Sequence, residues 1–177
     1  MTDFFISVDK LSEYISELSA GDRVYLSGEI YTARDAAHLR LVKLLEENKP
    51  LPFKLSGAVI YFAGPTPSRD DGTIGSFGPT TSSRMDPFSP MLLDKGLIAM
   101  IGKGNRNSDV TDAIKRNKAV YFCAGGGFGA LISRSILCVE EIAFPELGCE
   151  SIKRLVVEKL PLVVATDCHG NSIFERN

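Results

Sequence analysis

Short, uninterrupted runs of apolar residues recur along this chain. Three of them, residues 58–63, 97–101 and 119–123, have the length of a β-strand. A continuous apolar run is typical of a strand covered on both faces, whereas a strand with one solvent-exposed face alternates apolar and polar positions. These runs therefore predict strands in the interior of a layered sheet.

Segments with helical periodicity lie between these runs. Residues 34–47 gather alanines and leucines on one face, and a second helix is expected from Ser108 or Asp109, as N-cap, to Lys115. Helices that alternate with buried strands are typical of an α/β domain. We therefore expect a layered sheet with flanking helices, and residues 1–177 as a single domain.

The two ends of the chain add further elements. Near the N-terminus, residues 11–18 have helical spacing, with Ser7 or Asp9 as the expected N-cap and Gly21 after the helix; a strand is expected at 24–28. The C-terminal part contains two more strand-like runs, which are Leu155–Val157 and Leu162–Thr166.

Composition and charge exclude several classes of protein. The chain has 177 residues, 44% of them hydrophobic and 24% charged, with a formal net charge of −2. Such a chain can bury a core without disulfides, and it lacks the basic excess that binding to nucleic acid requires. Its apolar runs are too short to span a membrane, and it begins without the basic stretch of a secretory leader. We expect a soluble cytoplasmic protein without nucleic-acid or membrane partners.

The cysteines do not have the spacing of a metal site. Cys123, Cys138, Cys149 and Cys168 form no Cys-x-x-Cys pair, and the chain has only two histidines. We therefore expect no zinc ion or iron–sulfur cluster bound by this chain alone. The four thiols are expected to pack as small hydrophobic groups.

One segment interrupts the alternation of helices and strands. Residues 64–90 are rich in Gly, Pro, Ser and Thr, and a loop of this length in a compact domain is often functional. Within it, Gly78–Asp86 combines hydroxyl groups, backbone amides and Arg84, which suits an anion that carries oxygens. Asp86 and Pro87 are also expected to begin a short helix, with Asp86 as N-cap.

A second arginine lies at a predicted junction between a strand and a helix. Arg34 presents a planar fork that suits a carboxylate, and ligands gather at the carboxyl ends of strands in open α/β sheets. The alternative is a surface arginine paired with Asp35. His38 follows four residues later on the same helical face, where a structural role is the alternative.

Two glycine-rich segments resemble nucleotide-binding motifs. Gly102-Lys103-Gly104 has neither the spacing nor the hydroxyl of a P-loop, so we exclude that motif. Gly125–Ala130 matches Gly-x-Gly-x-x-Gly/Ala after a strand, which leaves a dinucleotide-binding module as an alternative. Glycines that allow close approach of backbone to a substrate or a neighbouring loop are the other interpretation.

Taken together, these motifs resemble a known family. The segments Ala33–His38, Ala63–Thr66, Gly78–Asp86, Gly102–Gly104 and the glycine cluster at Gly125 occur in this order. The chain resembles the β subunit, or C-terminal domain, of the iron–sulfur hydro-lyases class I fumarate hydratase and L(+)-tartrate dehydratase. Gly78–Asp86 is the most diagnostic segment, and the resemblance covers nearly the whole chain.

The resemblance implies a fold, a partner and a cofactor. The fold would be a swivelling β/β/α domain. The partner would be an α subunit that carries a [4Fe–4S] cluster on its own cysteines, in an α2β2 assembly. The open iron of that cluster would act as a Lewis acid on the substrate hydroxyl.

The resemblance also implies roles for five residues. Arg34, Arg84 and Lys103 would bind the carboxylates of a C4 dicarboxylate, Thr80 would take the proton from carbon, and His38 would orient Arg34. A threonine hydroxyl needs an activating group, for which Asp35 or a group on the partner is conceivable.

The expected reaction is the interconversion of fumarate and malate, a step of the tricarboxylic acid cycle. Dehydration of L(+)-tartrate to oxaloacetate is the alternative within the family. A non-catalytic subunit and the dinucleotide-binding module are alternatives of other classes.

Overall fold

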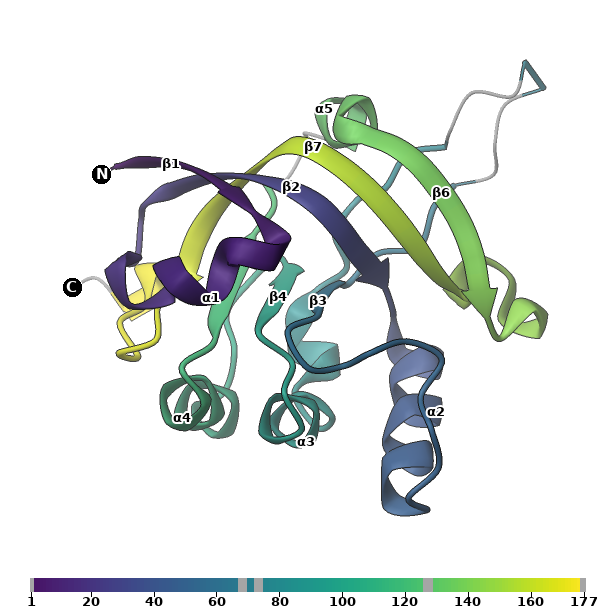
Figure 1. Cartoon of the computed structure of the whole chain (residues 1–177), viewed down its shortest axis with the longest axis horizontal. Helices are drawn as coiled ribbons and strands as arrows, with labels where there is room; N and C mark the ends of the chain where they lie inside the picture. The colour runs from purple at the N-terminus through teal and green to yellow at the C-terminus, as the bar shows by residue number, and fades with distance from the viewer. Residues whose placement is uncertain (1, 67–69, 72–74, 126–128, 176–177) are drawn as a thin grey trace.

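Parallel strands form most of the sheet in the computed structural model, which describes residues 2–66, 70–71, 75–125 and 129–175 (Figure 1). The strands are β1 (Asp3–Ser7), β2 (Arg23–Thr32), β3 (Val59–Tyr61), β4 (Ala99–Gly102), β5 (Val120–Cys123), β6 (Ile136–Ala143) and β7 (Ile152–Thr166). Their order is β1-β2-β3-β4-β5-β7-β6. β1 to β5 are parallel, and β7 runs antiparallel to β5, β6 and β2. Because β7 pairs with both β5 and β2, the strands from β2 to β5 and β7 close into a ring.

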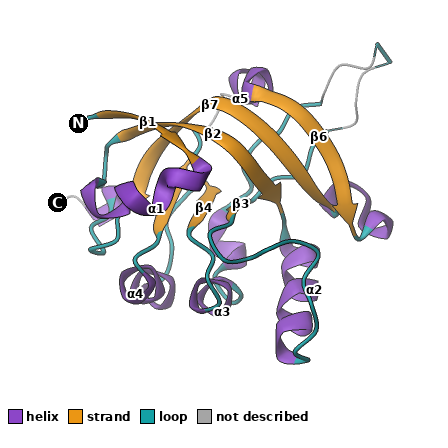
Figure 2. Ribbon diagram, in the orientation of Figure 1, coloured by secondary structure: helices purple, strands orange, loops and turns teal. Residues whose placement is uncertain are grey.

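Helices connect and cover these strands (Figure 2). The α-helices are α1 (Leu11–Tyr14), α2 (Asp35–Glu46), α3 (Ser89–Asp94), α4 (Ser108–Asn117) and α5 (Gly129–Ser135). Shorter 3-10 turns are η1 (Val8–Lys10), η2 (Ile15–Glu17), η3 (Ser82–Met85), η4 (Pro145–Glu150) and η5 (Ile173–Glu175). Figure 1 shows α2, α3 and α4 together on one side of the strands, below the arch that β2, β7 and β6 form in that view.

The central strands are covered on both faces, as their apolar runs predict. In β5, Val120 and Phe122 belong to the cluster inside the ring of strands, whereas Tyr121 belongs to the cluster between the sheet and the helices. In β4, Ile101 belongs to the cluster inside the ring and Met100 to the cluster between the sheet and the helices. The predicted mixed α/β architecture with flanking helices is therefore confirmed.

Some predicted boundaries are wrong for local reasons. The two runs near the C-terminus form the single strand β7, which continues through the exposed residues Glu158 and Lys159 although Lys159 has a φ of 49°. The expected helix at 11–18 is divided into α1 and two 3-10 turns, and Ser7 makes no side-chain cap bond there. Gly21, with a φ of 100°, does end this region.

Two predicted helix caps are also corrected. α4 begins at Ser108, one or two residues earlier than the expected caps Ser108 or Asp109 imply, because the Asn107 side chain accepts a hydrogen bond from the Val110 amide at 3.0 Å. Asp86 does not cap a helix, because α3 starts only at Ser89 and the carboxylate of Asp86 binds Arg106 and the Asn107 amide instead. No helix among the described residues has the length and apolar character needed to cross a membrane.

Candidate active site

The carboxyl ends of the parallel strands bring three distant segments together. Hydrogen bonds continue past the strands, from the Ala33 amide to the Tyr61 carbonyl at 3.1 Å and from the Phe62 amide to the Ile101 carbonyl at 2.8 Å. Arg34 therefore lies just beyond the end of β2, and Lys103 just beyond the end of β4. This is the edge at which open α/β sheets bind ligands.

The segment 78–86 lies across this same edge. The Thr80 amide donates to the Phe62 carbonyl at 2.6 Å, and the Ser82 amide donates to the Lys103 carbonyl at 2.9 Å. Thr81 also forms an isolated bridge with Lys103. The segment that contains Thr80 and Arg84 is thus hydrogen-bonded to the ends of both β3 and β4.

Arg84 connects this segment to α2. Its Nη2 donates to the Oδ2 of Asp35, the first residue of α2. The side chains of Arg84 and Asp35 are 52% and 34% exposed, so the pair lies at the surface. Lys103 is exposed and Thr80 is half-buried. The structure therefore brings Arg34, Thr80, Arg84 and Lys103 to one edge of the sheet.

Arg34 occupies a confined position. A Cβ atom on Gly64 would lie 3.1 Å from the Arg34 Cδ, 3.3 Å from its Nη1 and 2.8 Å from the Cys149 carbonyl. Glycine at position 64 therefore makes room for the arginine. Among the described residues, the Arg34 Nε is one of three buried side-chain nitrogen or oxygen atoms without a hydrogen-bond partner. Buried donors are normally paired, so this atom remains available to an acceptor.

The other two such atoms lie within four residues of Arg34, on Asp35 and His38. His38 is completely buried, with its Nδ1 2.9 Å from the Arg34 carbonyl and its ring against those of Phe62 and Phe88. Burial lowers the pKa of His38 to about 4. The neutral ring then donates from Nδ1 to that carbonyl, and Nε2 is left as an acceptor. This contact fits the expected role of His38 in orienting Arg34, a role that stays a prediction.

The predicted activation of Thr80 by Asp35 has no contact to support it. The hydrogen bond that Asp35 makes is with Arg84, and its Oδ1 has no hydrogen-bond partner. The expected surface pairing of an arginine with Asp35 does occur, but the arginine is Arg84 rather than Arg34.

A buried ion pair beneath this edge has no sequence signal. Arg106 is 6% exposed and Asp86 is 7% exposed, and the Arg106 Nε donates to Asp86 at 2.6 Å. The two residues lie 20 positions apart, so no helical or strand periodicity relates them. Arginine and aspartate are rarely buried unless paired, and neither partner could be assigned to the other from the sequence.

The dinucleotide alternative lacks its structural context. Gly125 follows β5 and α5 begins at Gly129, but residues 126–128 lie outside the described residues. The next strand, β6, pairs antiparallel with β7. A dinucleotide-binding unit requires a parallel strand at this point.

The cysteines correct one prediction. Cys168 is buried and Cys123 is half-buried, and burial raises the pKa of both thiols. Cys138 and Cys149 are exposed, so the expectation that all four pack as hydrophobic groups is wrong for these two. The described residues contain no group of three or more His, Cys, Asp or Glu side chains suited to a metal ion.

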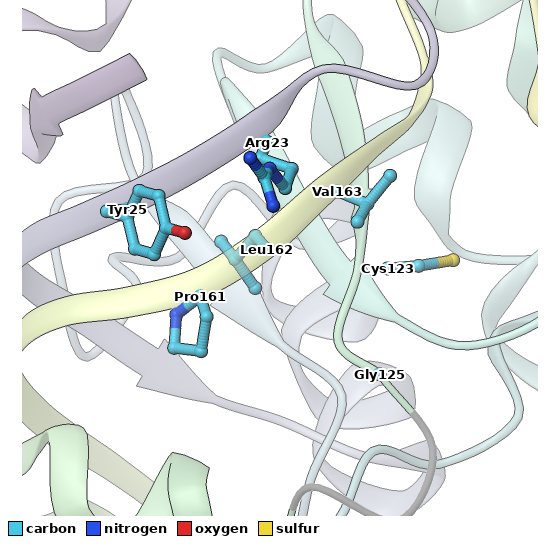
Figure 3. Close-up of a pocket in the computed structure, with 7 residues that line it drawn as sticks. All are labelled: Arg23, Tyr25, Cys123, Gly125, Pro161, Leu162 and Val163. Carbon is cyan, nitrogen blue, oxygen red and sulfur yellow. The ribbon is translucent and has the colours of Figure 1, made fainter. Parts of the chain in front are cut away.

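A small apolar pocket of about 170 Å³ is lined by none of these three cations. Figure 3 shows the residues that line it. Its lining comes from β2, from β7 and from the end of β5. The lining residues are Arg23, Tyr25, Cys123, Gly125, Pro161, Leu162 and Val163. None of the five predicted site residues lines it, so it is not the predicted dicarboxylate site.

Comparison with known proteins adds an independent line of evidence. The family model described as "Fumarase C-terminus" matches residues 3–177. "Fumarate hydratase 2" of Leishmania major is 36% identical over 171 residues, which are 96% of this chain and 30% of that protein.

Two relatives are closer to this chain in length. The "Putative L(+)-tartrate dehydratase subunit beta" of Methanocaldococcus jannaschii is 40% identical over 91% of this chain and 86% of its own length. The "L(+)-tartrate dehydratase subunit beta" of Escherichia coli is 32% identical over 94% of this chain and 84% of its own length. The chain thus spans most of these two relatives but less than a third of the Leishmania protein.

Proposed function

Because the chain belongs to the fumarase C-terminus family, we propose that it is the β subunit of a hydro-lyase that hydrates fumarate to malate and reverses that reaction. The relatives that it covers almost completely are named as β subunits, which supports a separate α subunit that completes the site. An α2β2 assembly, a swivelling β/β/α fold and a cytoplasmic location belong to the same proposal.

The observation that carries this proposal is the meeting of three cationic side chains with Thr80 at one edge of the sheet. Arg34 follows β2 and Lys103 follows β4, with β3 between these two strands, and Arg84 is hydrogen-bonded at the same edge to Asp35. A C4 dicarboxylate carries two negative charges at a fixed separation, and forked guanidinium groups bind carboxylates with defined geometry. In the proposed complex, Arg34 and Arg84 bind the two carboxylates and Lys103 adds a further positive charge.

These cations also favour the reaction itself. Loss of a proton from the carbon beside a carboxylate places additional negative charge on that carboxylate. A cation already held there stabilises the transition state more than the ground state. We assign the acceptance of that proton to Thr80, with an activating group from the partner, because Asp35 is paired with Arg84.

The cofactor is proposed to lie on the α subunit. The described residues of this chain do not fit an iron–sulfur cluster, because they gather no three potential ligands. The resemblance implies a [4Fe–4S] cluster held by partner cysteines, where it would supply Lewis-acid chemistry to the leaving hydroxyl.

Dehydration of L(+)-tartrate to oxaloacetate is the second candidate. It is favoured by the tartrate dehydratase relative that is 40% identical over 86% of its own length. Both substrates are C4 dicarboxylates and would use the same cations. Tartrate differs in bearing two hydroxyl groups, for which groups on the partner would provide part of the recognition.

Anaerobic co-expression with the cysteine-bearing partner tests the function. The purified complex is assayed for fumarate hydration and for tartrate dehydration, with this chain alone as the control. We expect fumarate hydration by the complex and a colourless, inactive isolated chain. Activity on tartrate alone would favour the second candidate, and a brown, active preparation of this chain alone would contradict the two-subunit proposal.

A further inference from the structure

The segment that contains Thr80 and Arg84 is attached to Lys103 through a buried serine. Ser82 is fully buried, and its hydroxyl accepts a hydrogen bond from the Lys103 amide at 3.0 Å. In return, the Ser82 amide donates to the Lys103 carbonyl. A Cβ atom on Gly102 would lie 1.9 Å from the Ser82 Oγ, so glycine is required for the hydroxyl to approach this closely.

Tyr121 completes a chain of hydrogen bonds beneath this attachment. Its hydroxyl lies 2.8 Å from the Ser82 Oγ and 2.8 Å from the Gly104 carbonyl oxygen. Burial raises the pKa of the Tyr121 phenol, so the phenol keeps its proton. Because a carbonyl can only accept, the phenol donates to Gly104 and the Ser82 hydroxyl donates to the phenol oxygen. Each hydroxyl in this chain therefore both donates and accepts.

Arg106 fixes the other end of the same segment. Its Nε donates to Asp86 at 2.6 Å and its Nη2 donates to the Ser89 hydroxyl at 2.6 Å. The guanidinium carbon lies 4.9 Å from the centre of the Tyr121 ring, the same ring whose hydroxyl faces Ser82. Asp86 also accepts from the Asn107 amide at 3.0 Å.

These contacts hold the segment at Ser82 and at Asp86, on either side of Arg84. A buried ion pair is weak evidence for stability, since apolar replacements are often as stable. The ion pair does fix the position of Asp86 relative to Arg106, because the guanidinium group donates to both Asp86 and Ser89 at once. Misplacement of a binding group by about 1 Å is able to reduce a rate by about 10²-fold.

We propose that Tyr121 and Arg106 are positioning residues, which set Thr80 and Arg84 relative to Lys103 through Ser82 and Asp86. Neither residue is assigned to contact the substrate. The predicted effect of these two residues on activity rests on the proposed function. Their predicted effect on the segment 78–86 is measurable without any substrate.

Two conservative variants separate positioning from folding. Tyr121→Phe keeps the ring under Arg106 and removes only the hydroxyl. Arg106→Lys keeps the charge beside Asp86 but cannot reach Asp86 and Ser89 together. The matched control is Arg116→Lys, which changes an exposed pair in which Arg116 binds Asp94 through two contacts of 2.8 Å.

The first measurement is hydrogen exchange of backbone amides. We expect exchange at Ser82 and Lys103 to become at least about tenfold faster in Tyr121→Phe and Arg106→Lys, without change at Ile60 in β3. Arg116→Lys should leave all these amides as in the wild type. Unchanged exchange at Ser82 and Lys103 in both folded variants would overturn the inference, whatever reaction the complex catalyses.

The second measurement is kcat/KM of the co-expressed complex. We expect a fall of at least about tenfold in both variants at unchanged folded fraction, and less than twofold in Arg116→Lys. Ser82→Ala combined with Tyr121→Phe should lose no more than the worse single variant, because the two hydroxyls act in one chain. Wild-type activity in both variants would refute the positioning role. If the wild-type complex were itself inactive on fumarate and on tartrate, the proposed function would be refuted, and the hydrogen-exchange measurement would then decide the inference.

Discussion

Asp35 accepts a hydrogen bond from Arg84, which lies 49 residues further along the chain. Asp35 directly follows Arg34, so this pair joins two of the proposed carboxylate-binding residues. The carboxylate of Asp35 holds Arg84 at the edge of the sheet before substrate binds. A substrate carboxylate would then meet a guanidinium that is already positioned.

Replacement of Arg84 tests this relationship. We expect Arg84→Ala to reduce kcat/KM of the complex by at least about 10²-fold, or roughly 2.7 kcal/mol, because a desolvated carboxylate contact is lost. The side chain is half exposed, so the melting temperature should change little. The control is Arg116→Ala, which removes an exposed arginine from the far end of α4. Turnover close to that of the wild type would remove Arg84 from the site.

Replacement of Lys103 tests the contribution of the β4 end. The Lys103 side chain is exposed, while its backbone carries the bonds to Ser82, so Lys103→Ala should leave the segment 78–86 in place. We expect a loss of at least about 10²-fold in kcat/KM, from removal of one positive charge near the developing carboxylate charge. Lys43→Ala, at an exposed position of α2, is the matched control. A loss of the same size in both variants would indicate a general charge effect instead.

Thr80→Ala tests the transfer of the proton. The Thr80 amide remains hydrogen-bonded to the Phe62 carbonyl in this variant, so the backbone should keep its path. We expect exchange of the substrate carbon-bound hydrogen with solvent deuterium to disappear, while the visible absorbance of the co-expressed complex is unchanged. Thr81→Ala, one residue further and exposed, is the control. Exchange at the wild-type rate in Thr80→Ala would exclude the threonine as the proton acceptor.

The sequence predicts the central strands well because they are covered on both faces. Val120–Cys123 is apolar at every position, and a buried run this short has the length of a strand rather than of a helix. The pattern of apolar runs predicts neither β1 nor β6. In β6 the apolar residues 136–139 are followed by Glu140 and Glu141 at exposed positions, so the strand as a whole is not a continuous apolar run. The pairing of β1 with β2 and of β6 with β7 is a tertiary effect that local periodicity does not encode.

The sequence likewise predicts one part of the candidate site and not the other. Arg34 and Lys103 could be placed at the sheet edge because each follows a predicted strand. The pairing of Arg84 with Asp35 and the burial of Arg106 depend on how the segment 78–86 crosses that edge. These residues lie 49 and 20 positions apart in the sequence, so their contacts become visible only when the folded structure is known.

His38 provides a prediction of stability against pH. Burial lowers its pKa to about 4 in the folded chain, whereas an unfolded histidine titrates near 6.5. Between these values the unfolded state binds the additional proton, so the free energy of unfolding falls as the pH decreases from about 6.5 and this contribution levels off below about 4. The full effect is about 3 kcal/mol, from a shift of about 2.5 units at 1.36 kcal/mol per unit.

Urea unfolding at pH 7 and at pH 5 tests this contribution. We expect the free energy of unfolding of the wild type to be clearly lower at pH 5 than at pH 7, and that of His38→Gln to differ much less between the two pH values. His169→Gln, at the exposed histidine, should retain the wild-type dependence. If His38→Gln lost stability with acid as steeply as the wild type, a different group would be responsible for the pH dependence.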